Sequence, residues 1–460
     1  MFVKQLSIYG FKCFGKAVLD LQHPGRQSDG PLELPNVNLV LGDNGGGKSS
    51  VLRAVAIAIL APALLESGFV PYRLVRRSNG GPRIENSLLK VDCDLDPEDL
   101  IKSSTRIDTP SSTHSIELLA RIDRRDRGSL DRLHLEKVPS SPLERLIFDD
   151  YSHAFFVVGY GATRRTETGD FIESSARRSR GMRYQRVAGL FEDHVTLRPL
   201  QAWLERTSRK TEAIKKISEI LPDQLRFDGK IDDGENQYLF TFEDRVTPFT
   251  ALSDGHRAFI GWVGDLIGHL CDVTPPTVAI DKVSGIVLID EIDLHLHPAW
   301  QRTVVSTLSA AFPRLQFVMT SHSPLIANAL RKENIFVTAT EEDGTATIKQ
   351  IGENVFGRGV NQLLLSSYFG LQSTLPPELE SASRTLFAEA AEGDTSAALG
   401  FLEQLSAPTR TSNDVVPRVA QALERTRLES PAKAKRMRPK RAAKAKRKRT
   451  RPATKGRRVR

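Results

Sequence analysis

The chain has little cysteine, no obvious membrane-spanning run and no recognisable secretory leader. Its three cysteines, Cys13, Cys93 and Cys271, are too far apart in sequence for a disulfide framework or a zinc site. No apolar run reaches the length of a membrane span, and the longest candidate follows Lys48. The first residues, MFVKQLSIYGF, lack the basic-then-apolar order of a signal peptide. Together these absences predict a reduced, cytoplasmic protein.

Acidic residues are absent from the last thirty positions, and this absence locates the net charge of +9. Pro431 to Arg460 carries 16 Lys or Arg, which leaves 49 basic against 56 acidic residues elsewhere. Beyond alanine, Met437 and Val459 are its only apolar residues, so we expect a disordered tail. Its charge density favours sequence-independent contacts with nucleic-acid phosphates. The alternatives are a solvated solubility tail or attraction to the acidic body of a neighbouring chain.

A glycine-rich stretch, GDNGGGKSS, runs from Gly42 to Ser50 and matches G-x-x-x-x-G-K-[ST]. An apolar, β-branched run (37–41) precedes it and an alanine- and leucine-rich helical run (50–65) follows. Strand, glycine turn and helix are the setting that a phosphate-binding P-loop requires. A chance glycine loop capping a helix is the alternative interpretation.

The P-loop residues predict a site for ATP and Mg²⁺. Backbone N–H groups of such a loop point at phosphate oxygens, assisted by the positive end of the helix. Lys48 would reach the β- and γ-phosphates, and the Ser49 hydroxyl would ligate Mg²⁺. The nucleotide-binding residues that we predict in this stretch are Gly42, Asn44, Gly45, Gly47, Lys48, Ser49 and Ser50.

Two later stretches supply candidate catalytic groups. GIVLIDEID (285–293) is a strand-like run that delivers two acids at its carboxyl end, where α/β sheets bind ligands. Asp290 would hold Mg²⁺ and Glu291 would orient or deprotonate the attacking water. In FVMTSHSPL, His322 follows a strand and could hydrogen-bond the γ-phosphate. The alternatives are solvated strand-end acids and a structural turn histidine.

The remaining patterns place these motifs in a larger fold. We expect two antiparallel strands in 2–22, three more strands between 90 and 138 and helices in 190–221. Further strands should follow in 224–231 and 238–244, then a helix over 297–312 and a hairpin across 335–351. A helix should start near Ser253 within LSDGHRA. The arginine-rich stretch 162–186 is typical of a mobile loop, and 121–132 of a solvated face with balanced charge.

The order of these motifs resembles the heads of ABC-type ATPases. P-loop, LSDG-type helix, aliphatic-DE strand and strand-plus-His occur in the same order in the chromosome-maintenance and break-repair ATPases, RecF and the overcoming-lysogenization-defect nucleases. YGFKCF (9–14) resembles the N-F-[RK]-x-F opening of these heads, which implies Lys12 as a nucleotide contact. DEIDLHLHPAWQ and TSHSPLIA are most similar to short bacterial AAA-annotated ATPases, some of them anti-phage defence subunits acting beside separate nucleases.

The resemblance implies an α/β P-loop NTPase fold of ABC-ATPase type, with a mixed sheet, an antiparallel β subdomain and a helical lid. It also implies a homodimer or higher oligomer that sandwiches ATP, with Ser253 and Gly255 of one chain facing the γ-phosphate held by the other. We expect the head in 1–375, with 162–250 as loop plus helical lid. A helical segment in 376–428 and the disordered tail in 429–460 would follow.

Some residues depart from the pattern of these heads. No glutamine marks the loop before the lid; GYGATRR occupies that position, which suggests that Arg164 or Arg165 lies near phosphate or partner. Asp293, His295 and His297 alternate and could bind a metal instead of packing at the dimer interface. Roughly 200 residues without a heptad pattern separate the P-loop from LSDG, which argues against a long-armed ATPase.

The resemblance leaves two functions open. One is an ATP-hydrolysing dimer associated with DNA, in DNA repair or anti-phage defence. The other is an ATP-dependent scaffold or sensor that holds and releases a separate effector, such as a nuclease, with little turnover. No Toprim-like acidic cluster or HNH-like arrangement follows His322, so any nuclease would be another chain.

Overall fold

The computed structural model describes residues 1–26, 33–77, 83–95, 115–125, 129–137, 149–166, 180–232, 234, 237–374, 376–391, 394–397 and 399. The chain divides into two compact units, Met1–Thr374 and Leu375–Arg460. In the second unit the described residues form helix α13 (Pro377–Ala391). This helix lies within the segment predicted as helical, 376–428; the rest of that prediction beyond residue 399 and the basic tail fall outside the described residues.

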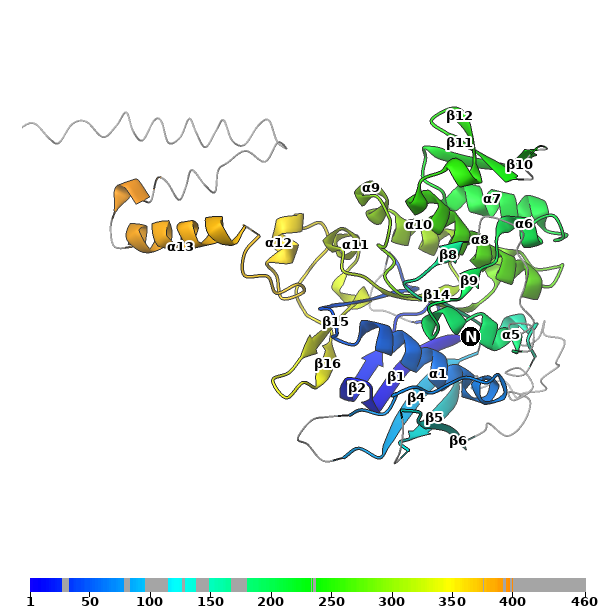
Figure 1. Ribbon diagram of the computed structural model, residues 1–460, viewed down its shortest axis with the longest axis horizontal. Helices are drawn as coiled ribbons and strands as arrows, with labels where there is room; N and C mark the ends of the chain where they lie inside the picture. Colours follow the sequence, from blue (N-terminus) through cyan, green and yellow to red (C-terminus); the bar gives the residue numbers. More distant parts are fainter. Residues whose placement is uncertain are drawn as a thin grey trace, which may run out of the picture. The chain divides into compact units, whose positions relative to one another are not determined.

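The first unit is built on a large sheet (Figure 1). The described strands of this unit, in all of its sheets, are β1 (Phe2–Phe11), β2 (Phe14–Asp20), β3 (Val37–Gly42), β4 (Asn86–Asp94), β5 (Ser115–Asp123), β6 (Arg132–Lys137), β7 (Phe156–Tyr160), β8 (Arg165–Thr166), β9 (Thr196–Leu197), β10 (Leu225–Asp232), β11 (Gln237–Phe242), β12 (Arg245–Pro248), β13 (Gly285–Ile289), β14 (Leu315–Thr320), β15 (Ile335–Thr340) and β16 (Ala346–Lys349). Its described α-helices are α1 (Lys48–Glu66), α5 (Met182–Gln185), α6 (Leu200–Trp203), α7 (Lys210–Ile220), α8 (Asp254–Val273), α9 (Pro298–Gln301), α10 (Val304–Ala311), α11 (Pro324–Asn328) and α12 (Val360–Leu364).

The eleven-stranded sheet is mixed, with the order β6-β5-β4-β1-β2-β16-β15-β3-β14-β13-β7. Strands β15, β3, β14, β13 and β7 run parallel, in a register that sets Val287 beside both Phe317 and Val158. Strands β6, β5, β4, β1 and β2 are antiparallel. The predicted mixed sheet with an antiparallel β subdomain is confirmed. The parallel strands are mostly apolar and buried because both of their faces are covered, and Asn38 and Gln316 are buried polar exceptions.

Helix α1 packs within the core between the antiparallel strands and one face of the parallel strands. Its residues Val51, Val55 and Ile59 are fully buried in one cluster with Leu89 of β4 and Val318 of β14. In the part of the chain that the structure describes, α1 is the one helix long and apolar enough to cross a membrane, and most of it is buried. Our expectation that no run reaches this length was therefore wrong.

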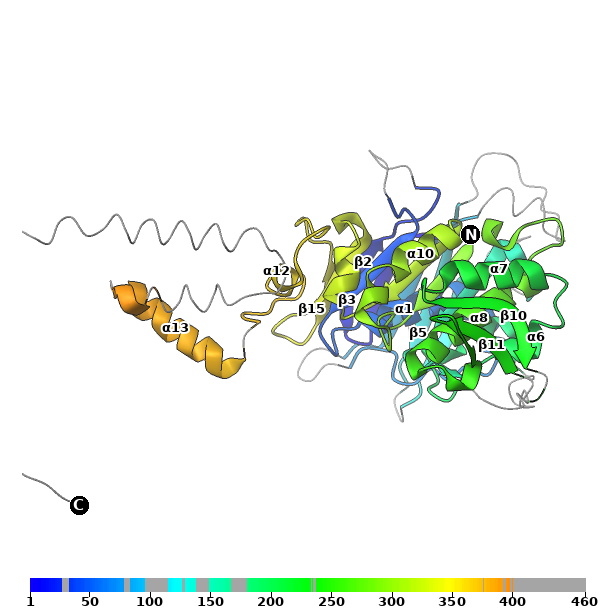
Figure 2. The same ribbon diagram turned by 90° about the horizontal axis from the view of Figure 1, so that it is seen from above.

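The opposite face of the parallel strands packs against α7, α8 and α10, which share a second apolar cluster with Val287 and Phe317. Figure 2 shows α7 beside β10 of the small sheet β10-β11-β12, and Phe242 of β11 contacts His256 of α8. Within 162–250, predicted as loop plus helical lid, α6 and α7 are short helices and 225–248 form this antiparallel sheet, whose first two strands were predicted in 224–231 and 238–244. Phe227, Tyr238 and Phe240 alternate along its strands and bury one face, which explains the strands.

Two other predictions changed in detail. The run 297–312, expected as one helix, is interrupted between α9 and α10. Asp131 was assigned to a solvated face, yet it is 2% exposed because its carboxylate accepts hydrogen bonds from the backbone N–H groups of Leu74 and Val75. Most of the arginine-rich stretch 162–186 lies outside the described residues, but α5 belongs to it and buries Arg183 and Tyr184.

Buried amide side chains join β1 and β2 to the parallel strands. The Gln316 side chain in β14 accepts from the Val3 N–H at 2.7 Å and donates to the carbonyls of Val3 and Gln22 at 2.7 and 2.8 Å. Asn38 in β3 accepts from the Gln22 N–H at 2.7 Å. Because Val3 and Gln316 belong to strands that are not neighbours in the sheet, these bonds fix how the two parts of the sheet pack.

We predict that Gln316→Leu destabilises the protein by about 2–3 kcal/mol, because the Val3 backbone groups lose their buried partners. Gln5→Leu is the matched control, since the Gln5 side chain bonds Asp20 at the exposed surface, and it should cost less than about 0.5 kcal/mol. Urea unfolding of both variants measures the difference. Equal losses would contradict a structural role for the buried amide.

Candidate functional site

The P-loop joins the carboxyl end of β3 to the first turn of α1. Gly42 has a φ of 141°, and a Cβ there would collide with the Thr338 side chain of β15, so glycine is required. The Lys48 ammonium donates to the carbonyls of Gly42 and Asp43, each at 2.8 Å. Burial lowers the pKa of Lys48, and the charges of Asp290 and Glu291 oppose that shift. The Lys48 side chain thus folds back over the P-loop and is held there by backbone carbonyls.

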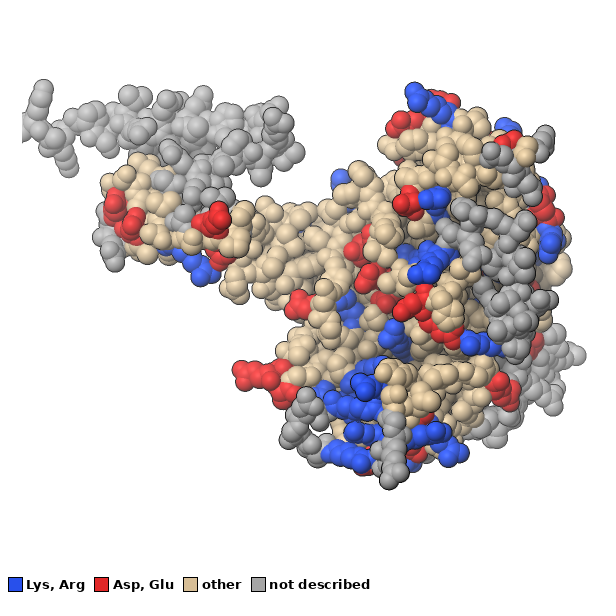
Figure 3. All heavy atoms as spheres, in the orientation of Figure 1, with Lys and Arg blue, Asp and Glu red and all other residues tan. Residues whose placement is uncertain are grey.

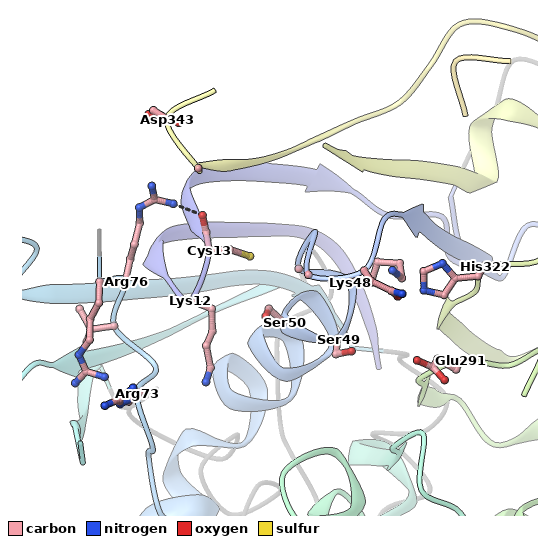
Figure 4. Close-up of a pocket in the computed structure, with 16 residues that line it drawn as sticks. Lys12, Cys13, Lys48, Ser49, Ser50, Arg73, Arg76, Glu291, His322 and Asp343 are labelled. Atoms are coloured by element: carbon pink, nitrogen blue, oxygen red, sulfur yellow. Dashed lines mark hydrogen bonds between the residues drawn. The ribbon is translucent and has the colours of Figure 1, made fainter. Parts of the chain in front are cut away.

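A cavity of about 750 Å³ opens over this loop. Predicted site residues on its wall are Lys12, Asn44, Gly45, Gly47, Lys48, Ser49, Ser50, Glu291 and His322. Figure 4 shows His322 beside Lys48 and Glu291 near Ser49, so both predicted catalytic side chains approach the P-loop. Gly42, Asp290, Ser253 and Gly255 are not on the cavity wall. The volume is in the range of cofactor and nucleotide pockets.

The two acids lie where β13 ends, next to the end of β14. The Thr320 hydroxyl donates to Asp290 Oδ1 at 2.6 Å and accepts from the Glu291 N–H at 2.7 Å. Asp290 is buried, whereas Glu291 reaches the cavity wall. Glu291 has a φ of 49°, a left-handed conformation that is uncommon for a residue with a side chain. The turn therefore points two consecutive carboxylates into different surroundings.

Basic residues that the sequence analysis missed line the other end of the cavity. Arg73 and Arg76, in the loop that follows α1, lie there with Lys12 (Figure 4), and Arg77 of the same loop also lines the cavity. Arg76 donates to the Cys13 carbonyl and to the Thr345 hydroxyl, and Arg77 pairs with Asp131 at 2.9 Å. The signal was three arginines within PYRLVRR, just past the P-loop helix.

Lys12 and Arg73 share an unusual backbone conformation. Both have positive φ, 51° and 46°, and the Lys12 N–H donates to the Leu74 carbonyl at 2.7 Å. Burial and the Arg53 charge lower the pKa of Lys12. Figure 3 shows Lys and Arg side chains gathered over the antiparallel strands, the side of the unit on which these residues lie. This end of the cavity is suited to an anionic ligand.

The LSDG segment forms the start of α8, away from the cavity. Ser253 is the exposed N-cap, and its Oγ lies 2.6 Å from His256 Nδ1. A Cβ on Gly255 would collide with the His295 carbonyl, so only glycine lets the helix start approach the segment after Glu291. The structure therefore keeps Ser253 and Gly255 together but does not bring them to Lys48 of the same chain.

The alternative metal site in 293–297 has no support. Among the described residues, no group of three or more His, Cys, Asp or Glu side chains is placed to hold a metal ion. His297 Nδ1 instead accepts from the Ala299 N–H at 3.3 Å and caps α9. Asp290 and Ser49 remain the candidate oxygen donors for Mg²⁺, and a carboxylate with a hydroxyl suits this hard cation.

Several known proteins are similar to this chain in sequence. The chain is 25% identical over 380 residues to the Septu protein PtuA of Bacillus mycoides (strain KBAB4), covering 82% of this chain and 46% of that protein. It is 38% identical over 113 residues to the retron Vc95 probable ATPase of Vibrio cholerae serotype O1 biovar El Tor, covering 25% and 22%. The chain thus spans less than half the length of either relative.

Among solved structures, an Smc head bound to the C-winged helix domain of ScpA aligns with a TM-score of 0.47 at 16% identity, covering 76% of this chain and 98% of that one. Residues 37–328 match the family model described as "AAA domain, putative AbiEii toxin, Type IV TA system". That segment includes the P-loop, the LSDG helix, the strand-end acids and His322, and it is more than half of the chain. The protein therefore belongs to this family of AAA domains.

Proposed function

We propose that the chain binds MgATP in the P-loop cavity, hydrolyses it, and works as a nucleotide-dependent dimer associated with DNA. The observation that carries the proposal is the approach of Glu291 and His322, each just beyond a parallel strand, to Lys48 and Ser49 of the P-loop. A phosphate cradle with a carboxylate on the same cavity wall is the arrangement that phosphoanhydride hydrolysis requires.

Each group would have a distinct task. Lys48 would exchange its two backbone carbonyls for phosphate oxygens. Ser49 and Asp290 would hold Mg²⁺, which supplies charge neutralisation at the phosphates. Glu291 would orient a water and accept its proton, and His322 would hydrogen-bond the terminal phosphate. Lys12, with the arginines that line the far end of the cavity, would add positive charge along the triphosphate.

Dimerisation is supported by the placement of Ser253. This exposed serine caps a helix N-terminus, which suits an anion, yet it is not on the cavity wall of its own chain. A second copy in two-fold symmetry would present Ser253 and Gly255 to the γ-phosphate and satisfy both sites at once.

The DNA association rests on the basic composition of Pro431 to Arg460. We place the activity in anti-phage defence or DNA repair, with a separate nuclease as partner, because the short bacterial ATPases that the chain resembles include defence subunits of this kind. A stable ATP-dependent complex that co-purifies with a nuclease, with little turnover, would favour the scaffold function instead.

Replacing Glu291 with Gln should lower kcat for ATP about 10²–10³-fold and leave ATP affinity within about threefold, because only the proton acceptor is lost. Glu341→Gln, which changes an exposed acid paired with Lys349, is the control and should leave kcat unchanged. Steady-state phosphate release and binding of a non-hydrolysable analogue measure both effects. Unaltered Mg-dependent hydrolysis by the Glu291 variant would exclude it as the base.

Ser253→Arg should leave ATP binding largely intact and block hydrolysis, because the bulky cation disrupts a surface that acts on another chain's nucleotide. Ser306→Arg on the exposed surface of α10 is the control. Light scattering with ATP should register a dimer for the parent and control chains only. Parallel loss of binding and hydrolysis would count against the composite site.

Truncation after Glu429 should abolish stimulation of the ATPase by DNA and leave the basal rate unchanged. Binding of DNA to the full chain should weaken steeply with salt, since the tail releases counterions from phosphates. Titration with labelled duplex at two salt concentrations tests this. Retained stimulation after truncation would place the DNA contact elsewhere.

A further inference from the structure

Arg164 lies just past the end of β7, in the loop where the resembling heads carry a glutamine. Its guanidinium donates to the backbone carbonyl of Asp290 and, at 2.5 Å, to that of Glu291. Its Nε donates to the Gly161 carbonyl at 3.2 Å. The hydrogen bonds of this side chain thus go to backbone oxygens, and two of them belong to the residues that carry the proposed chemistry.

Those two carbonyls belong to a turn that needs support. β13 ends at Ile289, so the Asp290 and Glu291 carbonyls lie beyond the strand ladder. Glu291 is held in the left-handed region, which costs energy in any residue with a Cβ. Thr320 holds the Glu291 N–H, and Arg164 holds the carbonyl of the same residue. The peptide groups on both sides of the Glu291 side chain are therefore fixed.

The other face of the guanidinium contacts α8. Arg164 lies over the Trp262 ring, 5.8 Å from its centroid, and Trp262 is 1% exposed. An arginine over an indole face is a favourable cation–π contact. Trp262 belongs to the helix whose first turn carries Ser253 and Gly255. Arg164 is thus in contact with both the Glu291 turn and the LSDG helix.

Tyr160 makes a second connection between α8 and the strand-end acids. Tyr160, the last residue of β7, donates its hydroxyl to Asp265 of α8 at 3.0 Å. Its carbonyl accepts from the Asp290 N–H at 2.8 Å. The Tyr160 and Trp262 ring centroids are 5.8 Å apart. The end of β7 therefore joins α8 to the strand-end acids through two adjacent contacts.

The positive charge of Arg164 suits a position near three acidic residues. Burial lowers the pKa of its guanidinium to about 10, while Asp290, Asp293 and Glu291 act in the opposite direction. The group remains a cation at neutral pH. It is not on the wall of the P-loop cavity, so within the described residues it acts on the peptide groups of the acids and not on the ligand space.

We propose that Arg164 is a positioning residue that fixes the Glu291 turn and couples it to α8, so that the LSDG segment and the hydrolytic carboxylate of one chain move together. The inference rests on the proposed function, in which Glu291 is the base. It assigns Arg164 a different task from the contact with phosphate or partner that the sequence suggested.

The geometry sets the expected effect of substitution. Without the hydrogen bonds from Arg164, the Glu291 carboxylate no longer has a fixed position relative to the attacking water. A displacement of about 1 Å costs roughly 100-fold in rate. Arg164→Ala should therefore lower kcat by about that factor and leave ATP affinity within about threefold. Arg164→Lys keeps the charge but offers a point donor in place of a planar fork, so it should retain more activity than the alanine variant.

The experiment uses the full chain with Arg164→Ala, Arg164→Lys and the control Arg206→Ala, whose side chain is exposed. kcat and KM for MgATP, analogue binding and the thermal midpoint are measured for each. Millimolar methylguanidinium should partly restore kcat in Arg164→Ala, and methylammonium should not. Arg206→Ala should behave as the parent chain.

Hydrogen exchange without nucleotide gives a readout independent of turnover. Peptides covering 286–296 should exchange faster in both Arg164 variants than in the parent and in Arg206→Ala. Trp262→Phe combined with Arg164→Lys should lower kcat by less than the product of the single effects if the two residues act as one unit.

Three results would overturn the inference: equal loss of affinity and kcat, a kcat change below about threefold in Arg164→Ala, or unchanged exchange of 286–296. A parent chain that does not hydrolyse ATP would refute the proposed function instead. In that case the exchange measurement still decides whether Arg164 holds the turn.

Discussion

The site depends on the two hydrogen bonds of the Thr320 hydroxyl. Thr320 is the last residue of β14, and its hydroxyl donates to the Asp290 carboxylate and accepts from the Glu291 N–H. These bonds fix the ends of the two neighbouring strands relative to each other. β14 also pairs with β3, from which the P-loop emerges. One short hydrogen-bonded contact therefore sets the position of two acids relative to a phosphate cradle that lies more than 200 residues earlier in the sequence.

Buried polar contacts elsewhere in the first unit hold together the segments that surround this edge of the sheet. Gln316 and Asn38 tie the antiparallel strands to the parallel ones through buried amides. Asp131 then draws the backbone of 74–75 inward, which brings Arg73 and Arg77 to the cavity that Lys12 enters from the β1–β2 turn. Buried polar groups are costly unless satisfied, so such contacts specify one packing and not many.

Sequence patterns predicted the elements whose signal is local. The P-loop, the two acids, His322 and the strands of both sheet halves are marked by glycine, by apolar runs and by residues at strand ends. Burial of charge was not predictable in the same way. Asp131 and Arg183 are polar in sequence and buried in the fold because backbone groups far along the chain satisfy them.

The contacts of Arg164 were missed for a related reason. GYGATRR contains no periodicity, and Arg164 bonds the turn after β13 and contacts α8, both over 90 residues away. Long-range partners decide such contacts, and one sequence does not contain them. The small sheet β10-β11-β12 was different, because Phe227, Tyr238 and Phe240 alternate with more exposed residues and so give its first two strands a local signal.

Helix α1 has a mechanical consequence. Close-packed residues surround it along most of its length, so tilting or sliding it would open voids in the core on every side at once. The phosphate cradle at its first turn is therefore preorganised, and little conformational entropy of the chain needs to be lost when an anion arrives. Any change of shape on binding must fall on segments outside this core, where the surface of the molecule is free to respond.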